Sequence, residues 1–307
     1  MTFKRAAGIA LATLILWPQA LVAAETPLIA VLQEEKPDSV DAAIRAEIRV
    51  AFREQNGDWI PVCRETSQPD SRAACAFAGE TPAHWQVVLH GRDVGVVQTR
   101  DWLERDAYAG IGLLRVFGDE IPHAGPRTTE FAGWAGVPVH RPLIAFNVRR
   151  NWNVRWRNSY PADTPTASLL SSMRKLVPTV PACTQNGDRR GPGRPLVAAD
   201  IHVTELWKAP RGERLIGASL KTERVKPCEY DFDLVADSWF YDDGKSPVRA
   251  LPALASNDTT HRLVDIGDFA GNGHEEALFW LSGYDEDGFI LLFDGFRKSA
   301  RFAWTYH

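Results

Sequence analysis

The sequence predicts a mainly β protein built from antiparallel sheets, and three observations support this fold class. Stretches in which apolar and polar residues alternate recur along the chain, as in strands that bury one face. These stretches come in pairs around turn residues, as in β-hairpins. Only one segment has helical periodicity. Because hairpins join neighbouring strands in opposite directions, we expect antiparallel sheets.

Four hairpins are predicted from these pairs. In AEIRVAFREQNGDWIPV, Ile48, Val50 and Phe52 alternate with charged residues before a turn at Asn56-Gly57. The other three turns are predicted around Gly91-Arg92-Asp93, Pro210-Arg211-Gly212 and Asp242-Asp243-Gly244.

One short helix is predicted to interrupt the strands, in TPTASLLSSMRKLVPTVPAC from Thr164. Its apolar residues at helical spacing are Leu169, Leu170, Met173 and Leu176. This stripe indicates packing on the edge of the sheet structure. The Gly-, Pro- and Arg-rich stretch that follows either splits the chain near residues 180–195 or forms one long loop.

The stretch NVRRNWNVRWRN, residues 147–158, combines basic and aromatic residues. If it is a strand, alternate residues share a face, so the face with the apolar residues is predicted to lie in the core. That set is Val148, Trp152, Val154 and Trp156. The opposite row of arginine and asparagine is either a solvated face or a grip for an anionic or hydroxyl-rich ligand.

The stretch DFAGNGHEE, which begins at Asp268, has the spacing of a calcium loop. Asp268, Asn272 and Glu276 occupy its first, fifth and ninth positions, and His274 at the seventh would supply its backbone carbonyl. Calcium takes about six to eight oxygen ligands, which such loops complete with water. Calcium is therefore the candidate cofactor.

The longer stretch VDIGDFAGNGHEEALFWL resembles a single FG-GAP or VCBS-type repeat of integrin-alpha-like β-propellers. In that family an acidic, glycine-rich loop precedes an apolar strand. The resemblance implies that Asp268, Asn272 and Glu276 are ligands, with His274 at the carbonyl position. Ala270 departs from the pattern, because the third position is normally Asp or Asn, so we expect weak or absent calcium binding. The resemblance covers residues 263–307, without a second clear copy.

Four strands are predicted in residues 263–307, and they form a C-terminal unit. They are Leu263–Phe269, Ala277–Tyr284, Phe289–Phe293 and Phe302–Tyr306. Four meandering strands make one propeller blade, so we expect a propeller-like fold, with two packed β-sandwich-like subdomains as the alternative. We assign Asp285 and Asp287 to a turn rather than to a metal, because Asp287-Gly288 is a strong hairpin signal.

The N-terminus has the parts of a secretory signal peptide. Lys4 and Arg5 precede an apolar run that is shorter than the roughly 20 residues needed to cross a bilayer. Small residues end this segment at Ala24. We therefore predict a signal peptide over residues 1–24 and a β domain over residues 25–307, periplasmic or secreted, without a transmembrane segment.

Four cysteines in an exported chain predict two disulfides. The candidates are Cys63, Cys75, Cys183 and Cys228. Proximity in sequence favours pairing the first with the second and the third with the fourth, although the spacing leaves all three pairings open.

The charge and the motifs favour a binding or scaffold protein over an enzyme. The net charge of −4 argues against a nucleic-acid partner, which would require a basic face. LIGASLKT lacks the glycines of a nucleophile elbow, and HEEAL lacks the second histidine of a zinc motif. We expect an exported protein that binds an unidentified protein or glycan. The alternative is a secreted hydrolase, on a propeller scaffold, acting on polysaccharide or phosphate esters.

Overall fold

The computed structural model describes residues 26–35, 45–62, 82–103, 115–118, 130–134, 139–140, 142–150, 156–160, 165–183, 193–221, 224–225, 237–255 and 259–305. In this part of the chain the secondary structure is almost entirely β, and neighbouring strands in each sheet run antiparallel. The predicted fold class is therefore confirmed.

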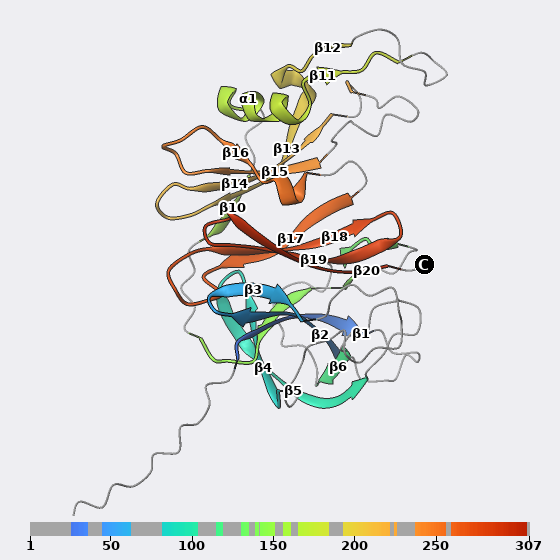
Figure 1. Ribbon diagram of the computed structural model, residues 1–307, viewed down its shortest axis with the longest axis vertical. Helices are drawn as coiled ribbons and strands as arrows, with labels where there is room; N and C mark the ends of the chain where they lie inside the picture. The colour runs from blue at the N-terminus through green and yellow to red at the C-terminus, as the bar shows by residue number, and fades with distance from the viewer. Residues whose placement is uncertain are drawn as a thin grey trace, which may run out of the picture.

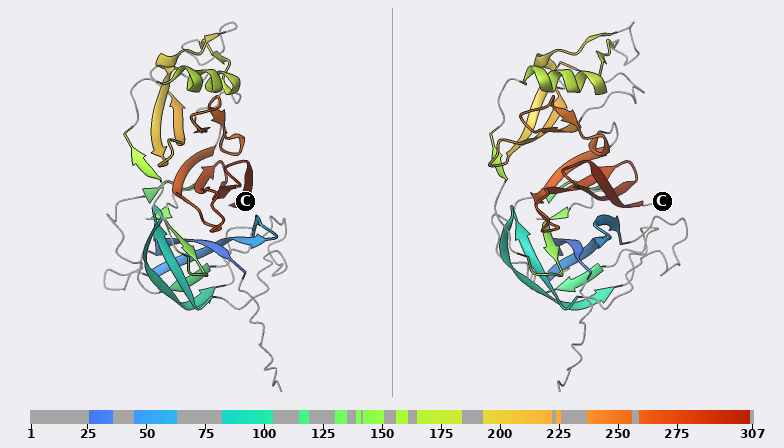
Figure 2. Two further views of the ribbon diagram at one scale, coloured as in Figure 1. Left: turned by 90° about the vertical axis from the view of Figure 1, so that its left-hand side faces the viewer. Right: turned by 60° about the vertical axis from the view of Figure 1, so that its left-hand side comes forward.

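The first sheet is strongly curled (Figure 2). Its strand order is β1-β9-β4-β5-β6-β2-β3, and an additional pairing of β1 with β2 joins six of the strands into a ring. These strands are β1 (Leu28–Glu35), β2 (Arg45–Gln55), β3 (Asp58–Pro61), β4 (His84–Leu89), β5 (Arg92–Leu103), β6 (Arg115–Gly118) and β9 (Leu143–Phe146). A separate pair consists of β7 (Glu130–Phe131) and β8 (Val139–His140).

The second sheet has five strands in the order β10-β13-β14-β15-β16. They are β10 (Arg157–Ser159), β13 (Ile201–Lys208), β14 (Arg214–Leu220), β15 (Asp237–Asp242) and β16 (Arg249–Ala250). Beyond this sheet lie α1 (Ala167–Leu176) and the short pair β11 (Thr179–Val180) and β12 (Arg194–Pro195) (Figure 1). The 3-10 helices are η3 (Ala198–Asp200) and η4 (Pro252–Leu254).

The predicted helix is confirmed as α1. Thr166 caps its start, where the Thr166 side chain accepts a hydrogen bond from the backbone N–H of Leu169 at 3.2 Å. Leu169 and Met173 are buried in a cluster that they share with β13, β14 and β15. The apolar stripe therefore covers one face of the five-stranded sheet.

The C-terminal sheet is a four-stranded meander that lies between the other two sheets (Figure 1). It contains β17 (Thr259–Gly267), β18 (Glu276–Gly283), β19 (Glu286–Phe293) and β20 (Lys298–Thr305). Trp280, Phe289 and Phe302 on one face pack into the core of the curled sheet. Phe279 and Ile290 on the opposite face pack into the core of the five-stranded sheet. Because both faces are covered, β18 and β19 are apolar almost throughout.

A propeller is not shown by this arrangement. The three large sheets of the described chain contain seven, five and four strands and pack in layers. They are not a set of equal four-stranded blades around a channel, which is what defines a propeller.

Two sequence predictions are corrected by the strand register. The turn between β18 and β19 is Tyr284–Asp285, since Gly283 pairs with Glu286, so Asp287-Gly288 lies inside β19 and does not reverse the chain. Residues 147–150 of the Arg/Trp stretch are not a strand, and residues 151–155 lie outside the described chain. Trp156 is buried as expected.

Several predicted features lie outside the described residues, among them the signal peptide, residues 184–192, Cys63, Cys75 and Cys228. Cys183 is described and is disulfide-bonded, with its partner outside the described residues. No helix among the described residues has the length and apolar character required to cross a membrane.

Candidate functional site

The loop between β17 and β18 contains the four candidate metal ligands. Asp268 folds the loop on itself, because its Oδ1 accepts from the N–H of Asn272 and its Oδ2 from the N–H of Gly273, both at 2.9 Å. The Oδ1 of Asn272 accepts from the N–H of His274 at 2.8 Å. Side chains of this type commonly bond the backbone a few residues ahead and so stabilise a turn. Asn272 and His274 are exposed.

Glu276, the first residue of β18, is buried beneath this loop. Its Oε2 accepts hydrogen bonds from the N–H of Phe269 at 2.5 Å and of Ala270 at 3.2 Å. Burial raises the pKa of Glu276 to about 8, although these two hydrogen bonds act to lower it. The negative charges of Asp268 and Glu275 raise the pKa further.

The side chain of Arg150 lies against this loop from the segment that follows β9. A Cβ atom placed on Gly271 would lie 2.9 Å from Arg150 Nη1, so the guanidinium passes close to the backbone of the loop, and the φ of 69° at this position favours glycine. Arg150 Nη2 lies 3.9 Å from Glu54 Oε2 of β2. Burial lowers the pKa of Arg150, whereas Glu54, Glu276 and Asp268 act to raise it. The guanidinium therefore lies in the field of three carboxylates.

Gln86 of β4 fixes the backbone of Arg150. The N–H of Arg150 donates to Gln86 Oε1 at 2.8 Å, and Gln86 Nε2 donates to the carbonyl of Arg150 at 3.3 Å. Sequence analysis assigned Arg150 no role and did not indicate this contact. No local signal could have revealed it, because the partners lie on other strands.

The loop residues do not fit a calcium ion well. Of the four candidates, only Asp268 and Glu276 carry carboxylates, and Ala270 supplies no side-chain oxygen at the third position. A guanidinium already places positive charge against the loop, and it would repel a second cation. Within the described ranges, no group of three or more His, Cys, Asp or Glu side chains could hold a metal.

A second group of polar and aromatic side chains lies where all three large sheets meet. His90, in the turn between β4 and β5, donates its backbone N–H to Asp265 Oδ2 of β17 at 2.7 Å, and His90 Nδ1 lies 3.8 Å from Asp265 Oδ1. The His90 ring lies 5.2 Å from the ring of Trp207, on β13. Trp207 Nε1 in turn donates to Glu205 Oε2 at 3.1 Å. We call His90, Trp207, Glu205 and Asp265 the three-sheet junction.

The junction contains ionisable groups whose pKa values are shifted mainly by burial. Burial raises the pKa of Asp265 to about 7, opposed by hydrogen bonds from the backbone of Ile266, His90 and Gly91. Burial, and then the charge of Arg92, lowers the pKa of His90. Shifted pKa values of this kind are frequent at functional sites.

One further carboxylate, Asp237, shares a charged neighbour with the junction. Burial raises the pKa of Asp237 and of Glu205, and in both cases the positive charge of Arg262 on β17 acts in the opposite direction. The half-exposed imidazole of His90 is the part of the junction that solvent reaches most easily. Sequence analysis did not single out the junction, since its residues are isolated along the chain.

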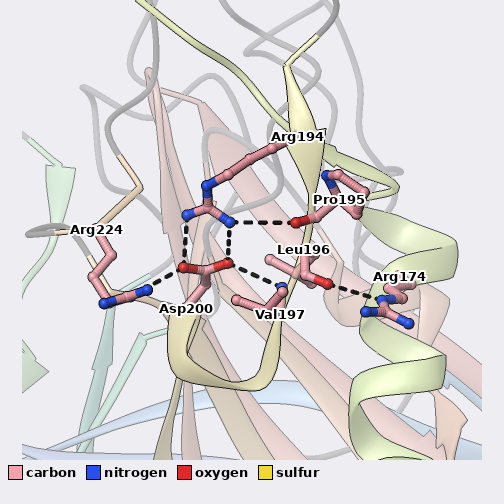
Figure 3. Close-up of polar contacts among 7 residues, drawn as sticks. All are labelled: Arg174, Arg194, Pro195, Leu196, Val197, Asp200 and Arg224. Carbon is pink, nitrogen blue, oxygen red and sulfur yellow. Dashed lines mark hydrogen bonds and ion pairs between the residues drawn. The ribbon is translucent and has the colours of Figure 1, made fainter.

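A third polar cluster surrounds Asp200, which is completely buried (Figure 3). Arg194 holds its carboxylate with two hydrogen bonds of 2.6 and 2.7 Å, and Arg224 Nε adds one of 3.1 Å. The N–H of Val197 also donates to Asp200 Oδ2 at 3.0 Å. The hydrogen bonds from Arg194 do most to lower the pKa of Asp200 to about 2.

Comparison of the chain with protein-family models, curated proteins and solved structures finds no match in any of the three. The likeness of residues 263–307 to an FG-GAP or VCBS-type repeat therefore stays a resemblance in sequence.

Proposed function

We propose that the protein is an exported binding or scaffold protein that recognises a hydroxyl-rich glycan at the three-sheet junction. The observation that supports this proposal is the meeting of His90, Trp207 and Asp265, which come from three different sheets. Layered sheets with two-sided cores hold such groups rigidly, and recognition sites are commonly built on rigid elements of this kind.

The chemistry of the junction suits hydroxyl groups. Glu205 and Asp237 are partly buried carboxylates, which accept hydrogen bonds from a sugar hydroxyl, and a half-exposed imidazole both donates and accepts. Arg262 adds a forked donor close enough to influence both carboxylates. A glycan would therefore find donors and acceptors together.

Binding to a panel of cell-envelope and extracellular polysaccharides, measured by calorimetry, tests this proposal. We expect one class to bind, and His90→Ala to weaken its affinity about tenfold or more, since the loss of one charged or aromatic contact costs about 1.4 kcal/mol or more. The matched control is His274→Ala, an exposed histidine on another loop. Equal affinities of the two variants for the polysaccharide would contradict the proposal.

A hydrolase is the second candidate function, and the raised pKa values of Glu205 and Asp237 favour it. A carboxylic acid that keeps its proton closer to neutral pH can serve as a general acid. Release of reducing ends or phosphate from a substrate panel measures this activity. If the protein turns over a substrate and Glu205→Gln abolishes the activity, the hydrolase is the better proposal. If a polysaccharide binds without turnover, the binding proposal is supported.

We also propose that the loop at 268–276 works without calcium, with the guanidinium of Arg150 as its built-in cation. The contact of Arg150 with Gly271 and the surrounding carboxylates support this proposal. In this role the loop joins the C-terminal sheet to the curled sheet, because Phe269 also packs on Phe146, with ring centroids 5.6 Å apart.

A further inference from the structure

The region around α1 carries an excess of positive charge. We define the arginine cap as the described residues 165–183, 193–200, 221, 224 and 225. Its cations are Arg174, Lys175, Arg194, Lys221 and Arg224, and its one acidic side chain is Asp200. The full sequence of residues 165–200 has the same bias, with five basic residues against Asp188 and Asp200, whereas the whole chain has a net charge of −4. Positive charge is therefore concentrated in this part of an acidic protein, which favours an anionic ligand there.

Buried Asp200 organises this charge. Arg194 and Arg224 both donate to Asp200 Oδ1, at 2.7 and 3.1 Å, so one carboxylate oxygen holds the two guanidinium groups side by side. Asp200 neutralises one of their two positive charges, which leaves a net charge of +1 on the trio. The side chains of Arg194 and Arg224 are 44% and 47% exposed, so the charge that remains faces solvent.

The two guanidinium groups keep donors for a ligand. A guanidinium carries five N–H groups. Among its contacts with described residues, Arg224 uses only Nε on Asp200, so its two terminal nitrogens are available. On the α1 side of the cluster, Arg174 Nε donates to the carbonyl of Leu196 at 2.9 Å (Figure 3). That bond fixes a third guanidinium near the same chain segment.

We propose that the arginine cap binds a tetrahedral oxyanion, a phosphate or sulfate group, through the outward N–H groups of Arg224 and Arg194. Arginine binds such groups through forked, charge-assisted hydrogen bonds. The two terminal nitrogens of Arg224 supply such a fork, held in place by the bond from its Nε to Asp200, whereas the terminal nitrogens of Arg194 already bond Asp200 and the carbonyl of Pro195, so Arg194 adds mainly its charge. The oxyanion is either free in solution or carried on a polymer. This site is separate from the three-sheet junction and does not depend on the function proposed for it.

Thermal unfolding of the full mature chain in inorganic phosphate tests the site, with sodium chloride at equal ionic strength as the reference. We expect phosphate at tens of millimolar to raise Tm by about 2–4 °C above the chloride reference, since a ligand of the native state stabilises it. Arg224→Gln should remove at least half of this rise. The matched control is Arg211→Gln, an exposed arginine in the turn between β13 and β14, which should keep the full rise.

A parallel experiment with heparin, a sulfated polysaccharide, identifies the source of the oxyanion. If phosphate raises Tm and Arg224→Gln removes this rise, the ligand is a free oxyanion. If only heparin raises Tm, and the same variant removes that rise, the oxyanion is carried on a polymer. If Arg224→Gln does not fold, Arg224→Lys takes its place. Lysine keeps the charge but not the fork, so this variant should lose part of the rise in Tm. The proposal is overturned if neither ligand protects beyond chloride, or if the Arg224 variant that folds keeps the full rise, as Arg211→Gln does.

Discussion

Arg150 has a structural role that no sequence pattern indicated. Its guanidinium lies among Glu54, Asp268 and Glu276, and its Nε is buried without a hydrogen-bond partner among the described residues. Arg150→Met would keep the length of the side chain and leave the charges of Glu54 and Asp268 without this cation, while Glu276 keeps its proton near neutral pH. We expect the free energy of unfolding to fall by about 1–3 kcal/mol, measured by urea denaturation. Arg149→Met, at the exposed neighbouring position, is the control and should change stability little.

The effect of calcium on Tm also tests the role of Arg150. Because Arg150 already supplies the positive charge, the Tm of the native chain should be the same in millimolar calcium and in chelator. A calcium-dependent rise in Tm, lost in Asp268→Ala, would contradict the role of Arg150 and would instead favour Asp268, Asn272, His274 and Glu276 as ligands.

At the scale of elements, hairpins and the helix could be predicted from sequence because their signals are local. Asn56-Gly57 does form the turn of the β2–β3 hairpin, with φ values of 56° and 83° that favour these two residues. Asp287-Gly288 has a similar composition but lies inside β19. There Gly288 allows β20 to approach β19 closely. Composition alone does not distinguish such a glycine from a glycine in a turn.

The candidate site could be predicted only where its members are neighbours in sequence. The loop at 268–276 keeps its polar residues within nine positions, so spacing alone marked it. The contact between His90 and Asp265 joins residues 175 positions apart, and that between Arg150 and Gln86 joins residues 64 apart. Such contacts form only when the sheets pack in layers, and they produce no periodic pattern in the sequence.

The substitution Gly288→Ala tests how closely β19 and β20 pack. A Cβ atom on Gly288 would lie 2.4 Å from the carbonyl oxygen of Phe302 and 2.6 Å from the Cα of Ala303. Backbone atoms cannot rotate away, so Gly288→Ala must push the strands apart. We expect the urea midpoint to fall, with a loss of about 1–3 kcal/mol or more. Ser299→Ala, at an exposed position of β20, should leave the midpoint almost unchanged, and an equal effect of the two substitutions would contradict this packing.

On the scale of the whole molecule, buried ionisable groups lie at the contacts of the C-terminal sheet with its neighbours. Asp265 meets His90 of the curled sheet, and the carbonyl of His261 accepts from Trp239 Nε1 of the five-stranded sheet at 3.3 Å. Glu276 lies beneath the loop that Arg150 contacts. Protonation of these groups is therefore coupled to how the layers pack, and the stability of the layered fold should depend on pH.

The direction of that dependence follows from the pKa shifts. Burial raises the pKa of Asp265 from 3.8 to about 7 and that of Glu276 from 4.5 to about 8. The folded chain therefore holds protons that the unfolded chain has released, and stability falls as pH rises toward 8. His261, whose pKa burial lowers from 6.5 to about 4, acts oppositely, but only below pH 6.5. From pH 6.5 to 8 the contribution of the histidines fades, and the two carboxylates with the largest upward shifts dominate the slope.

We expect the free energy of unfolding to decrease between pH 6.5 and 8 by up to about 1.4 kcal/mol per pH unit for each carboxylate that is still protonated. Urea denaturation at constant ionic strength measures this slope. Glu276→Gln keeps an oxygen that can accept from Phe269 and Ala270 but cannot ionise, so it should flatten the slope, and Asp265→Asn should flatten it further. Glu286→Gln, on the same sheet, should keep the native slope. A stability that rises over this interval would show that these carboxylates are ionised in the folded protein and that burial at the layer contacts does not govern their protonation.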